Sequence, residues 1–262
     1  MPEREDDLSL LVDAARRAGE IAARHWKQGP QIWDKPGGEG PVTAADLAVD
    51  EMLRTTLTAA RPDYGWLSEE TPDTPARLSQ RRTFIVDPID GTRAFIDGSR
   101  DFAHSLAIAD RGQVTAAVVY LPVKNRLFAA ALGRGATLNG APLAASTRDV
   151  EDQATILTSR PNLRPEHWRD APPPVARHFR SSLAYRLALV GQGRFDGMIT
   201  LRDSWEWDIA AGALIVAEAG GAISDRHDQR LVFNNPVPQL PGVLAAAPAL
   251  HRQLMARLVS AA

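Results

Sequence analysis

The 262-residue sequence contains no cysteine. Its absence excludes disulfides, thiolate zinc sites, iron–sulfur clusters and cysteine nucleophiles. No apolar run approaches the roughly 20 residues that a membrane-spanning helix needs. Residues 1–7 carry charges of both signs, where a secretory signal would be apolar. We therefore expect a cytoplasmic protein with no membrane partner.

Neither sign of charge is in excess, because 30 basic and 32 acidic residues leave a net charge of -2. No basic stripe is interleaved with aromatic residues, so the sequence gives no reason to expect a nucleic acid polymer as a partner. A small phosphorylated substrate needs only a local positive site and stays compatible with this composition. The length suits one large domain or two medium ones.

The pattern of apolar residues changes along the chain. Helical spacing comes first, strand patterns follow, and after a polar link at 146–153 strands and helices alternate. This order predicts an α+β protein with helices layered on sheets, divided into halves 1–145 and 146–262. We expect helices at 6–26, 43–60, 182–190, 208–219 and 248–259, and strands at 84–86, 105–109, 114–120, 127–131, 155–158, 197–201 and 243–246.

Two carboxylates directly follow the apolar strand 84–86. Asp87 and Asp90 bracket a proline and are followed by Gly91 and Thr92. A strand that ends in acids and turns through glycine into a helix offers oxygen ligands for a hard cation and free N–H groups for an anion. The pattern therefore indicates metal-assisted hydrolysis of a phosphate ester.

Other acids extend this metal site. Glu69 and Asp208 are the further candidates, and oxygen ligands without nearby histidine or cysteine favour Mg²⁺ over zinc. Two such ions about 3.5–4 Å apart can stabilise both the attacking and the leaving oxygen. The residues alone leave a second interpretation open, because acids such as Asp46, Asp90 and Asp208 also cap helices.

Longer motifs narrow the choice. The segment Asp87–Thr92 with Phe95, and the segment Trp207–Gly212 closed by Glu218–Gly221, resemble the two signatures of the inositol monophosphatase superfamily of Mg²⁺-dependent phosphatases. Segments 41–46 and 68–70 stand in the expected order. The resemblance implies a layered α/β/α/β/α sandwich with its active site between the two halves.

The resemblance also implies roles for individual residues. Two or three Mg²⁺ ions per site would be bound by Glu69, Asp87, the carbonyl of Ile89, Asp90 and Asp208. Thr92, polarised by Asp46, would orient the attacking water together with Glu69. The backbone amides of Gly91 and Thr92 would hold the phosphate. Lys35 resembles a flexible-loop lysine that approaches the site in relatives, and its alternative interpretation is an ordinary solvated lysine.

The substrate is less well defined. Inositol-type relatives carry an acid ahead of the Trp-Asp pair, where this chain has Thr200, Leu201 and Arg202. A base there favours a second phosphate, although an exposed arginine without that role is the alternative. Segments 41–46, 67–70, 158–160 and 181–183 resemble the CysQ-type branch, in which the Ser182 region would lie near the nucleotide.

We therefore predict a 3′(2′),5′-bisphosphate nucleotidase that converts adenosine 3′,5′-bisphosphate to AMP, as a monomer or homodimer. An inositol-1-phosphate phosphatase is the alternative, followed by histidinol-phosphate and fructose-1,6-bisphosphate phosphatases. A non-catalytic metal- or phosphate-binding regulator on the same scaffold is the rival class. His104, Trp205 and Trp207 are expected to have packing roles.

Overall fold

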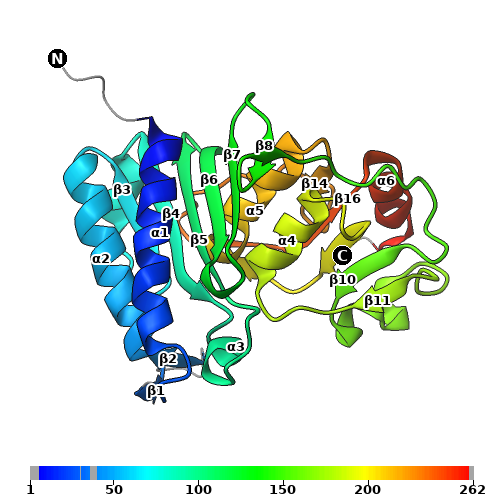
Figure 1. The fold of residues 1–262 in the computed structure, drawn as a ribbon. Helices are drawn as coiled ribbons and strands as arrows, with labels where there is room; N and C mark the ends of the chain where they lie inside the picture. Colours follow the sequence, from blue (N-terminus) through cyan, green and yellow to red (C-terminus); the bar gives the residue numbers. More distant parts are fainter. Residues whose placement is uncertain (1–5, 30, 36–39, 260–262) are drawn as a thin grey trace.

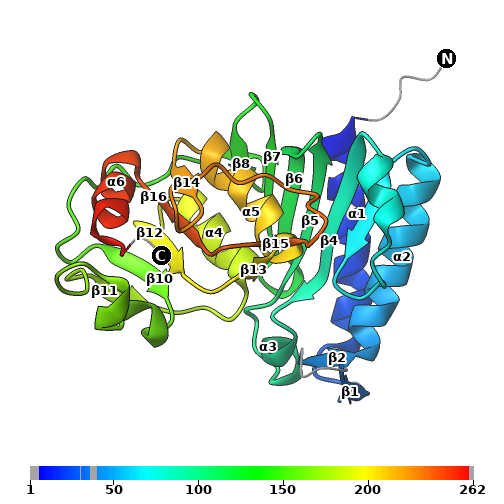
Figure 2. The same cartoon turned by 180° about the vertical axis from the view of Figure 1, so that it is seen from behind.

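The computed structural model describes residues 6–29, 31–35 and 40–259. Parts of the predicted acidic-basic N-terminus and of the loop that carries Lys35 lie outside these residues. The described chain forms five layers, which run from one end of the molecule to the other in both views (Figure 1, Figure 2). The layers are helices, a sheet, helices, a second sheet and a last helix, which confirms the predicted α+β sandwich.

The first three layers are a seven-stranded sheet, of order β3-β4-β5-β6-β7-β8-β9, and the helices on its two faces. Helices α1 and α2 cover one face, and α4 and α5 cover the other. The elements are α1 (Asp7–His25), α2 (Ala44–Ala60), β3 (Gly65–Ser68), β4 (Arg82–Asp90), β5 (Ala103–Asp110), β6 (Gln113–Leu121), β7 (Arg126–Ala131), β8 (Ala136–Leu138), β9 (Ala141–Pro142), α4 (Leu183–Gly191) and α5 (Glu206–Glu218).

The last two layers are a five-stranded sheet of order β11-β10-β12-β16-β14 and helix α6. Two small antiparallel pairs, β1 with β2 and β13 with β15, complete the described sheets. The elements are β1 (Ile32–Asp34), β2 (Pro41–Thr43), β10 (Thr155–Thr158), β11 (Ala176–His178), β12 (Gly197–Thr200), β13 (Ser204–Trp205), β14 (Ala222–Ser224), β15 (Gln239–Leu240), β16 (Val243–Ala246) and α6 (Pro248–Arg257).

Alternation of side chains explains why the layers can stack. Phe84 and Val86 of β4 point to the core beneath α1 and α2, whereas Ile85 between them joins the core around α4 and α5. In β10, Leu157 faces α4 and α5, and Ile156 faces α6. Both sheets are therefore apolar on two faces, as sheets covered on both sides must be.

Helix α5 lies between the two sheets and is apolar nearly all round, as its alanine-rich sequence allows. Its first turn places Asp208 at the junction of the layers. Helix α2 begins as predicted, because Thr43 accepts from the backbone of Ala45 and Asp46 while Asp46 accepts from the backbone of Thr43. In the described chain, no helix is both long and apolar enough to cross a membrane.

Two local expectations were wrong. Strand β4 continues through Asp90 with a shift of register between Asp87 and Asp90, so the acids lie in an irregular strand end and not after it. The helix expected after Gly91 is present as α3, which spans Thr92–Ile96. Helix α5 begins at Glu206 and not at Asp208. Strands β11 and β13–β15 were not predicted, because they have only two or three residues each.

Candidate active site

Three carboxylates from two distant parts of the chain meet beside α5. Asp87 and Asp90 come from the end of β4 and Asp208 from the first turn of α5, and their oxygens lie within 4.8 Å of one another. The hydroxyl of Ser105 on β5 donates to the carbonyl of Trp207 at 2.8 Å, which ties the start of α5 to the sheet that bears the other two acids.

The Asp87 carboxylate fits a cation. It is 1% exposed, and neither of its oxygens has a hydrogen-bond partner in the described structure. Burial, together with the charges of Glu69, Asp90 and Asp208, raises the pKa of Asp87 well above its usual range. A buried anion without partners is costly, and an oxygen-only set of ligands is what Mg²⁺ prefers.

Asp90 is held by the second half of the chain. One of its oxygens accepts from the Ser182 hydroxyl at 2.7 Å and from the Ala184 amide at 2.6 Å. Burial raises the pKa of Asp90 to about 6 despite these bonds. The capping interpretation therefore holds in part, because Asp90 contacts the first turn of α4, and not of α3.

Thr92 and Asp46 form the predicted pair. The Thr92 hydroxyl lies 3.2 Å from Asp46 Oδ1 and 3.2 Å from the carbonyl oxygen of Ile89. The other oxygen of Asp46 accepts from the amide and hydroxyl of Thr43. Burial raises the pKa of Asp46 to about 6, so it is mainly ionised at pH 7. Asp46 thus both caps α2 and orients Thr92.

Glu69 lies at the edge of the site and pairs with Lys35. The Lys35 ammonium is 2.7 Å from Glu69 Oε1 and 2.7 Å from Glu70 Oε1. Burial alone would lower the pKa of Lys35, but these two carboxylates raise it above its ordinary value. Lys35 is therefore mostly buried and ion-paired, and not a freely solvated loop lysine. Glu69 does not belong to the close group of three carboxylates.

Asp50 positions the Glu69–Glu70 turn and was missed from the sequence. It accepts from the Ser68 hydroxyl at 2.5 Å and from the Thr71 hydroxyl at 2.6 Å, on either side of the two glutamates. Asp50 follows Asp46 by one turn of α2, so two buried acids share one face of a helix. This spacing was the available signal.

Gly91 has the conformation that the motif requires. Its φ of +96° lies in the left-handed region, and a Cβ atom there would be 3.2 Å from the carbonyl oxygen of Asp101. Another residue would be strained, and its Cβ atom would crowd the Asp101 carbonyl. Gly91 and Thr92 line a cavity, so their backbone is accessible to a ligand.

Two cavities open at the site, and Glu69 and Arg202 line both. The first, of about 640 Å³, is lined by Lys35, Ser68, Glu69, Glu70, Thr71, Pro72, Asp73, Arg202, Trp205, Trp207, Asp208 and Pro238. The second, of about 710 Å³, is lined by Gly40, Pro41, Glu69, Gly91, Thr92, Arg93, Ala94, Ser159, Phe179, Ser181, Arg186, Thr200 and Arg202.

The proposed substrate contacts divide between these cavities. Arg202 is exposed and lines both, which is compatible with contact to a ligand and also with an exposed arginine that has no such role. Ser182 is fully buried, and its hydroxyl is bonded to Asp90, so it lines neither cavity and Ser181 takes that place. The direct role predicted for Ser182 is thus replaced by a positioning one.

Arg186 was also missed. It lines the second cavity, stacks on Phe179 with its guanidinium 4.3 Å from the ring centroid, and lies near enough to Asp90 to interact with its charge. The signal was a single arginine within the otherwise apolar segment 183–191. A base that interrupts a buried helix requires a polar partner.

His104 has the predicted structural role. It is fully buried on β5, and its Nδ1 lies 2.5 Å from the carbonyl oxygen of Pro88, which assigns the ring proton to Nδ1. Burial lowers the pKa of His104 to about 4, so the ring is neutral at pH 7. Through this bond to Pro88, His104 supports the turn between Asp87 and Asp90.

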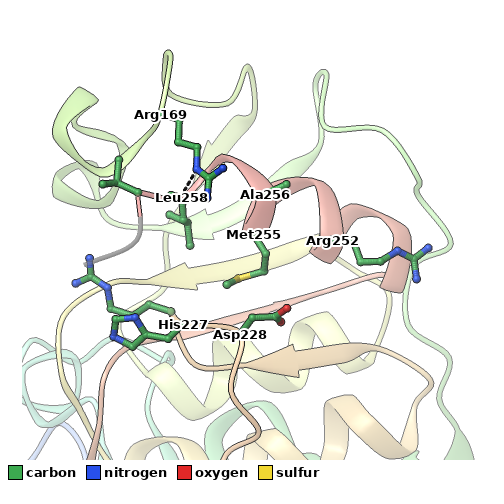
Figure 3. A pocket seen from close by; sticks show the side chains of 9 residues that line it. Arg169, His227, Asp228, Arg252, Met255, Ala256 and Leu258 are labelled. Carbon is green, nitrogen blue, oxygen red and sulfur yellow. Dashed lines mark hydrogen bonds between the residues drawn. The ribbon is translucent and has the colours of Figure 1, made fainter. Parts of the chain in front are cut away.

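A separate cavity of about 500 Å³ lies at α6, away from the carboxylates. Figure 3 shows Arg169 and Arg252 pointing apart there, with Asp228 as the single carboxylate in the lining. One acid and diverging arginines supply neither a cation site nor a shared anion site. The carboxylate-lined cavities therefore remain the candidate active site.

Comparisons with known proteins give a consistent result. The sequence matches the profile of the inositol monophosphatase family over residues 3–262. It is 36% identical over 227 residues to the inositol-1-monophosphatase of Rhizobium meliloti, covering 83% of this chain and 85% of the relative. It is 34% identical over 229 residues to the Nus factor SuhB of Escherichia coli, covering 83% and 84%.

Solved structures show the same fold. An IMPase from Thermotoga maritima superposes with a TM-score of 0.81 at 27% identity and covers 96% of each chain. The extragenic suppressor protein suhB from Bartonella henselae gives a TM-score of 0.80 at 29% identity, covering 95% of this chain and 96% of the other. The similarity therefore extends over all five layers.

Proposed function

We propose that this protein releases phosphate from inositol 1-phosphate. The chain belongs to the inositol monophosphatase family and is a metal-dependent phosphoric monoester hydrolase. The observation that supports this activity is the Asp87 carboxylate, buried with two unpartnered oxygens among further acids. The relatives reported above carry the names inositol-1-monophosphatase and SuhB. They favour the alternative that the sequence motifs ranked second, in place of the CysQ-type nucleotidase.

The metal would be bound by the side chains of Glu69, Asp87, Asp90 and Asp208 and by the carbonyl of Ile89. When bound, Mg²⁺ supplies positive charge that stabilises the oxygens of the phosphoryl group during its transfer to water. The two unpartnered oxygens of Asp87 make its carboxylate the side chain most available to hold a metal ion. Lys35 holds Glu69 Oε1 at 2.7 Å, so the other oxygen of Glu69 would be the one that binds a cation while this contact is kept.

The water would be oriented by Thr92. Asp46 is mainly ionised at neutral pH and accepts a hydrogen bond from the Thr92 hydroxyl, with 3.2 Å between Thr92 Oγ1 and Asp46 Oδ1. The lone pairs of the hydroxyl therefore stay free to accept from a water molecule. The proton of the attacking water can then pass to Thr92 Oγ1 as the threonine proton passes to Asp46. Gly91 and Thr92 would bind the phosphate through backbone N–H groups at the start of α3.

The leaving group would occupy the two cavities. Ser159, Ser181 and Thr200 line one of them and supply hydroxyls that suit a polyol. Arg202 separates this cavity from the one beside Asp208 and attracts anionic groups in either. A small polyol phosphate fits this mixture of hydroxyls and positive charge.

A nucleoside bisphosphate is the second candidate. Arg186 and Arg202 line the same cavity, and Thr200-Leu201-Arg202 offers no carboxylate to bind inositol hydroxyls. Two guanidinium groups beside a phosphate-binding turn favour a substrate with a second phosphate. This observation keeps adenosine 3′,5′-bisphosphate as the rival to inositol 1-phosphate.

The experiment is phosphate release from both compounds, measured side by side with and without Mg²⁺. A 100-fold preference in kcat/KM corresponds to about 2.7 kcal/mol of transition-state discrimination and decides between them. Arg202→Ala, with the exposed Arg194→Ala as a control, tests the second phosphate. A loss confined to the bisphosphate supports the nucleotide, whereas no Mg²⁺-dependent release from either compound rejects both substrates.

Three further expectations from the sequence remain predictions. These are the cytoplasmic location, the monomeric or dimeric state and the division into halves at residue 145. Size-exclusion chromatography with light scattering measures the second, and limited proteolysis near 143–154, where the described chain has no helix or strand, tests the third.

A further inference from the structure

Two tryptophans form a stacked pair in the wall of the active-site cavity. The rings of Trp205 and Trp207 lie 4.7 Å apart between centroids and 9° from parallel. Both line the cavity that Asp208, Lys35 and Arg202 also line. The pair is therefore adjacent to the carboxylates and faces the same space as the leaving group.

The backbone explains the stack. Trp205 ends β13 and Trp207 is in the first turn of α5, so Glu206 lies between them. The Glu206 carboxylate accepts from the amides of Asn234 and Asn235 at 2.6 and 2.9 Å. With Glu206 bound to that loop, the strand residue before it and the helix residue after it both lie in the cavity wall.

The pair is more than a packed core contact. Trp207 is 9% exposed and belongs to the core around α5, whereas Trp205 is half-buried and rests on it. The remaining lining of this cavity is largely charged or hydroxylated. An indole that stays accessible among such groups retains apolar surface for a ligand, and its anchored backbone means that little side-chain freedom is lost on binding.

We propose that Trp205, supported by Trp207, is a subsite that stacks on the ring of a cyclic leaving group. The ring presents either a flat π-face, as in a nucleobase, or the C–H face of a six-membered polyol. Linear leaving groups have no such face. This inference rests on the proposed phosphatase function, because it assigns the part of the substrate that lies beyond the phosphate.

The test compares three esters: inositol 1-phosphate, adenosine 3′,5′-bisphosphate and the linear glycerol 2-phosphate. For each, kcat/KM is measured with Mg²⁺ for the native protein, Trp205→Leu and Trp205→Phe. Loss of one stacked ring costs about 5- to 100-fold, so Trp205→Leu should reduce activity on at least one cyclic ester by that factor more than on glycerol 2-phosphate. Trp205→Phe should recover most of the difference.

The control is Trp26→Leu, because Trp26 is also half-buried but lines neither cavity. Equal losses by Trp205→Leu on all three esters, or no loss, would overturn the subsite. A preference for the nucleotide that disappears in the variant identifies the π-face, and one for inositol identifies the C–H face.

A binding measurement separates this inference from the proposed function. Calorimetric titration with adenosine 3′,5′-bisphosphate and inositol 1-phosphate, without Mg²⁺, reports on the subsite even if no ester is hydrolysed. Affinity for one of them that falls at least 5-fold in Trp205→Leu and returns in Trp205→Phe supports the subsite. Affinity unchanged by Trp205→Leu rejects it, while Mg²⁺-dependent hydrolysis of glycerol 2-phosphate would leave the phosphatase function standing.

Discussion

The hydroxyl of Ser182 donates a 2.7 Å hydrogen bond to Asp90, 92 positions earlier in the chain. The same hydroxyl oxygen accepts from the Tyr185 amide at 3.0 Å and so caps α4. One side chain thus joins the start of a helix in the second half of the chain to a proposed metal ligand in the first. The position of Asp90 depends on where α4 begins.

Ser182→Ala should therefore weaken metal binding. Groups that orient a metal ligand typically account for 10- to 100-fold in affinity, so the Mg²⁺ concentration for half-maximal activity should rise by about that factor. The lost cap should also lower the free energy of unfolding by about 1 kcal/mol. Ser182→Thr retains the hydroxyl and serves as the control. A variant that loses stability but keeps the native Mg²⁺ dependence would show that Ser182 caps α4 without affecting metal binding.

Asp87→Asn should abolish turnover without loss of the fold. The change replaces a buried acid, whose ionised form burial and the neighbouring carboxylates disfavour, by a neutral amide, so the metal-free variant should melt at or above the native temperature. Mg²⁺ should raise the melting temperature of the native protein and of the exposed control Asp13→Asn, but not of this variant. The measurements are thermal unfolding and kcat/KM. The value of kcat/KM should fall by more than about 100-fold, which exceeds the effect of residues that only orient a metal ligand. Near-native activity would remove Asp87 from the metal site.

Thr92→Ala tests the water-orienting pair. Without the hydroxyl, Asp46 has no route to the attacking water, and kcat should fall by about 100-fold or more, as for loss of a general base. Thr92→Ser keeps the oxygen and should retain most of the activity. Steady-state kinetics distinguish the roles, since a raised KM with native kcat would assign Thr92 to substrate binding alone.

His104 should make stability depend on pH. Its pKa is about 4 in the fold against 6.5 for the free side chain, so between these values the unfolded chain binds more protons. Its contribution is fully present above pH 6.5 and is lost as the pH falls toward 4, by about 3 kcal/mol in total.

Denaturant unfolding at pH 7, 6, 5 and 4 measures this effect when the native protein is compared with His104→Asn. Asparagine retains a donor for the Pro88 carbonyl but does not titrate, so the difference between the two proteins isolates His104 from the carboxylates. A difference in unfolding free energy that is constant with pH would mean that the pKa of His104 is the same in the folded and the unfolded chain.

Local sequence signals predicted some of the contacts around the candidate site, such as the Thr43–Asp46 capping box. The capping box at Thr43 and Asp46, and the run from Asp87 to Thr92, lie within single short segments, where spacing alone fixes which side chains meet. The expected alternation of helices and strands followed for the same reason, since it depends on side-chain period.

The rest depends on how distant elements pack. The contact between Ser182 and Asp90 needs the start of α4 to meet the end of β4, and no local pattern determines that approach. Strand β13 is two residues long, and it pairs with β15 from a distant part of the chain, where Glu206 also binds the Asn235 amide. Arg186 was overlooked because the cavity that it lines is completed by residues of distant segments, such as Gly91 and Arg202.

Helix α5 has a consequence for the synthesis of the chain. The face of the seven-stranded sheet that includes Ile85, Ala107 and Val119 belongs to the core around α4 and α5, which follow it in sequence. On the ribosome, all seven strands have emerged several seconds before Glu218 is translated. During that interval the nascent sheet exposes a continuous apolar face. The growing chain should therefore be most prone to aggregation, and most in need of a chaperone, between the completion of β9 and that of α5.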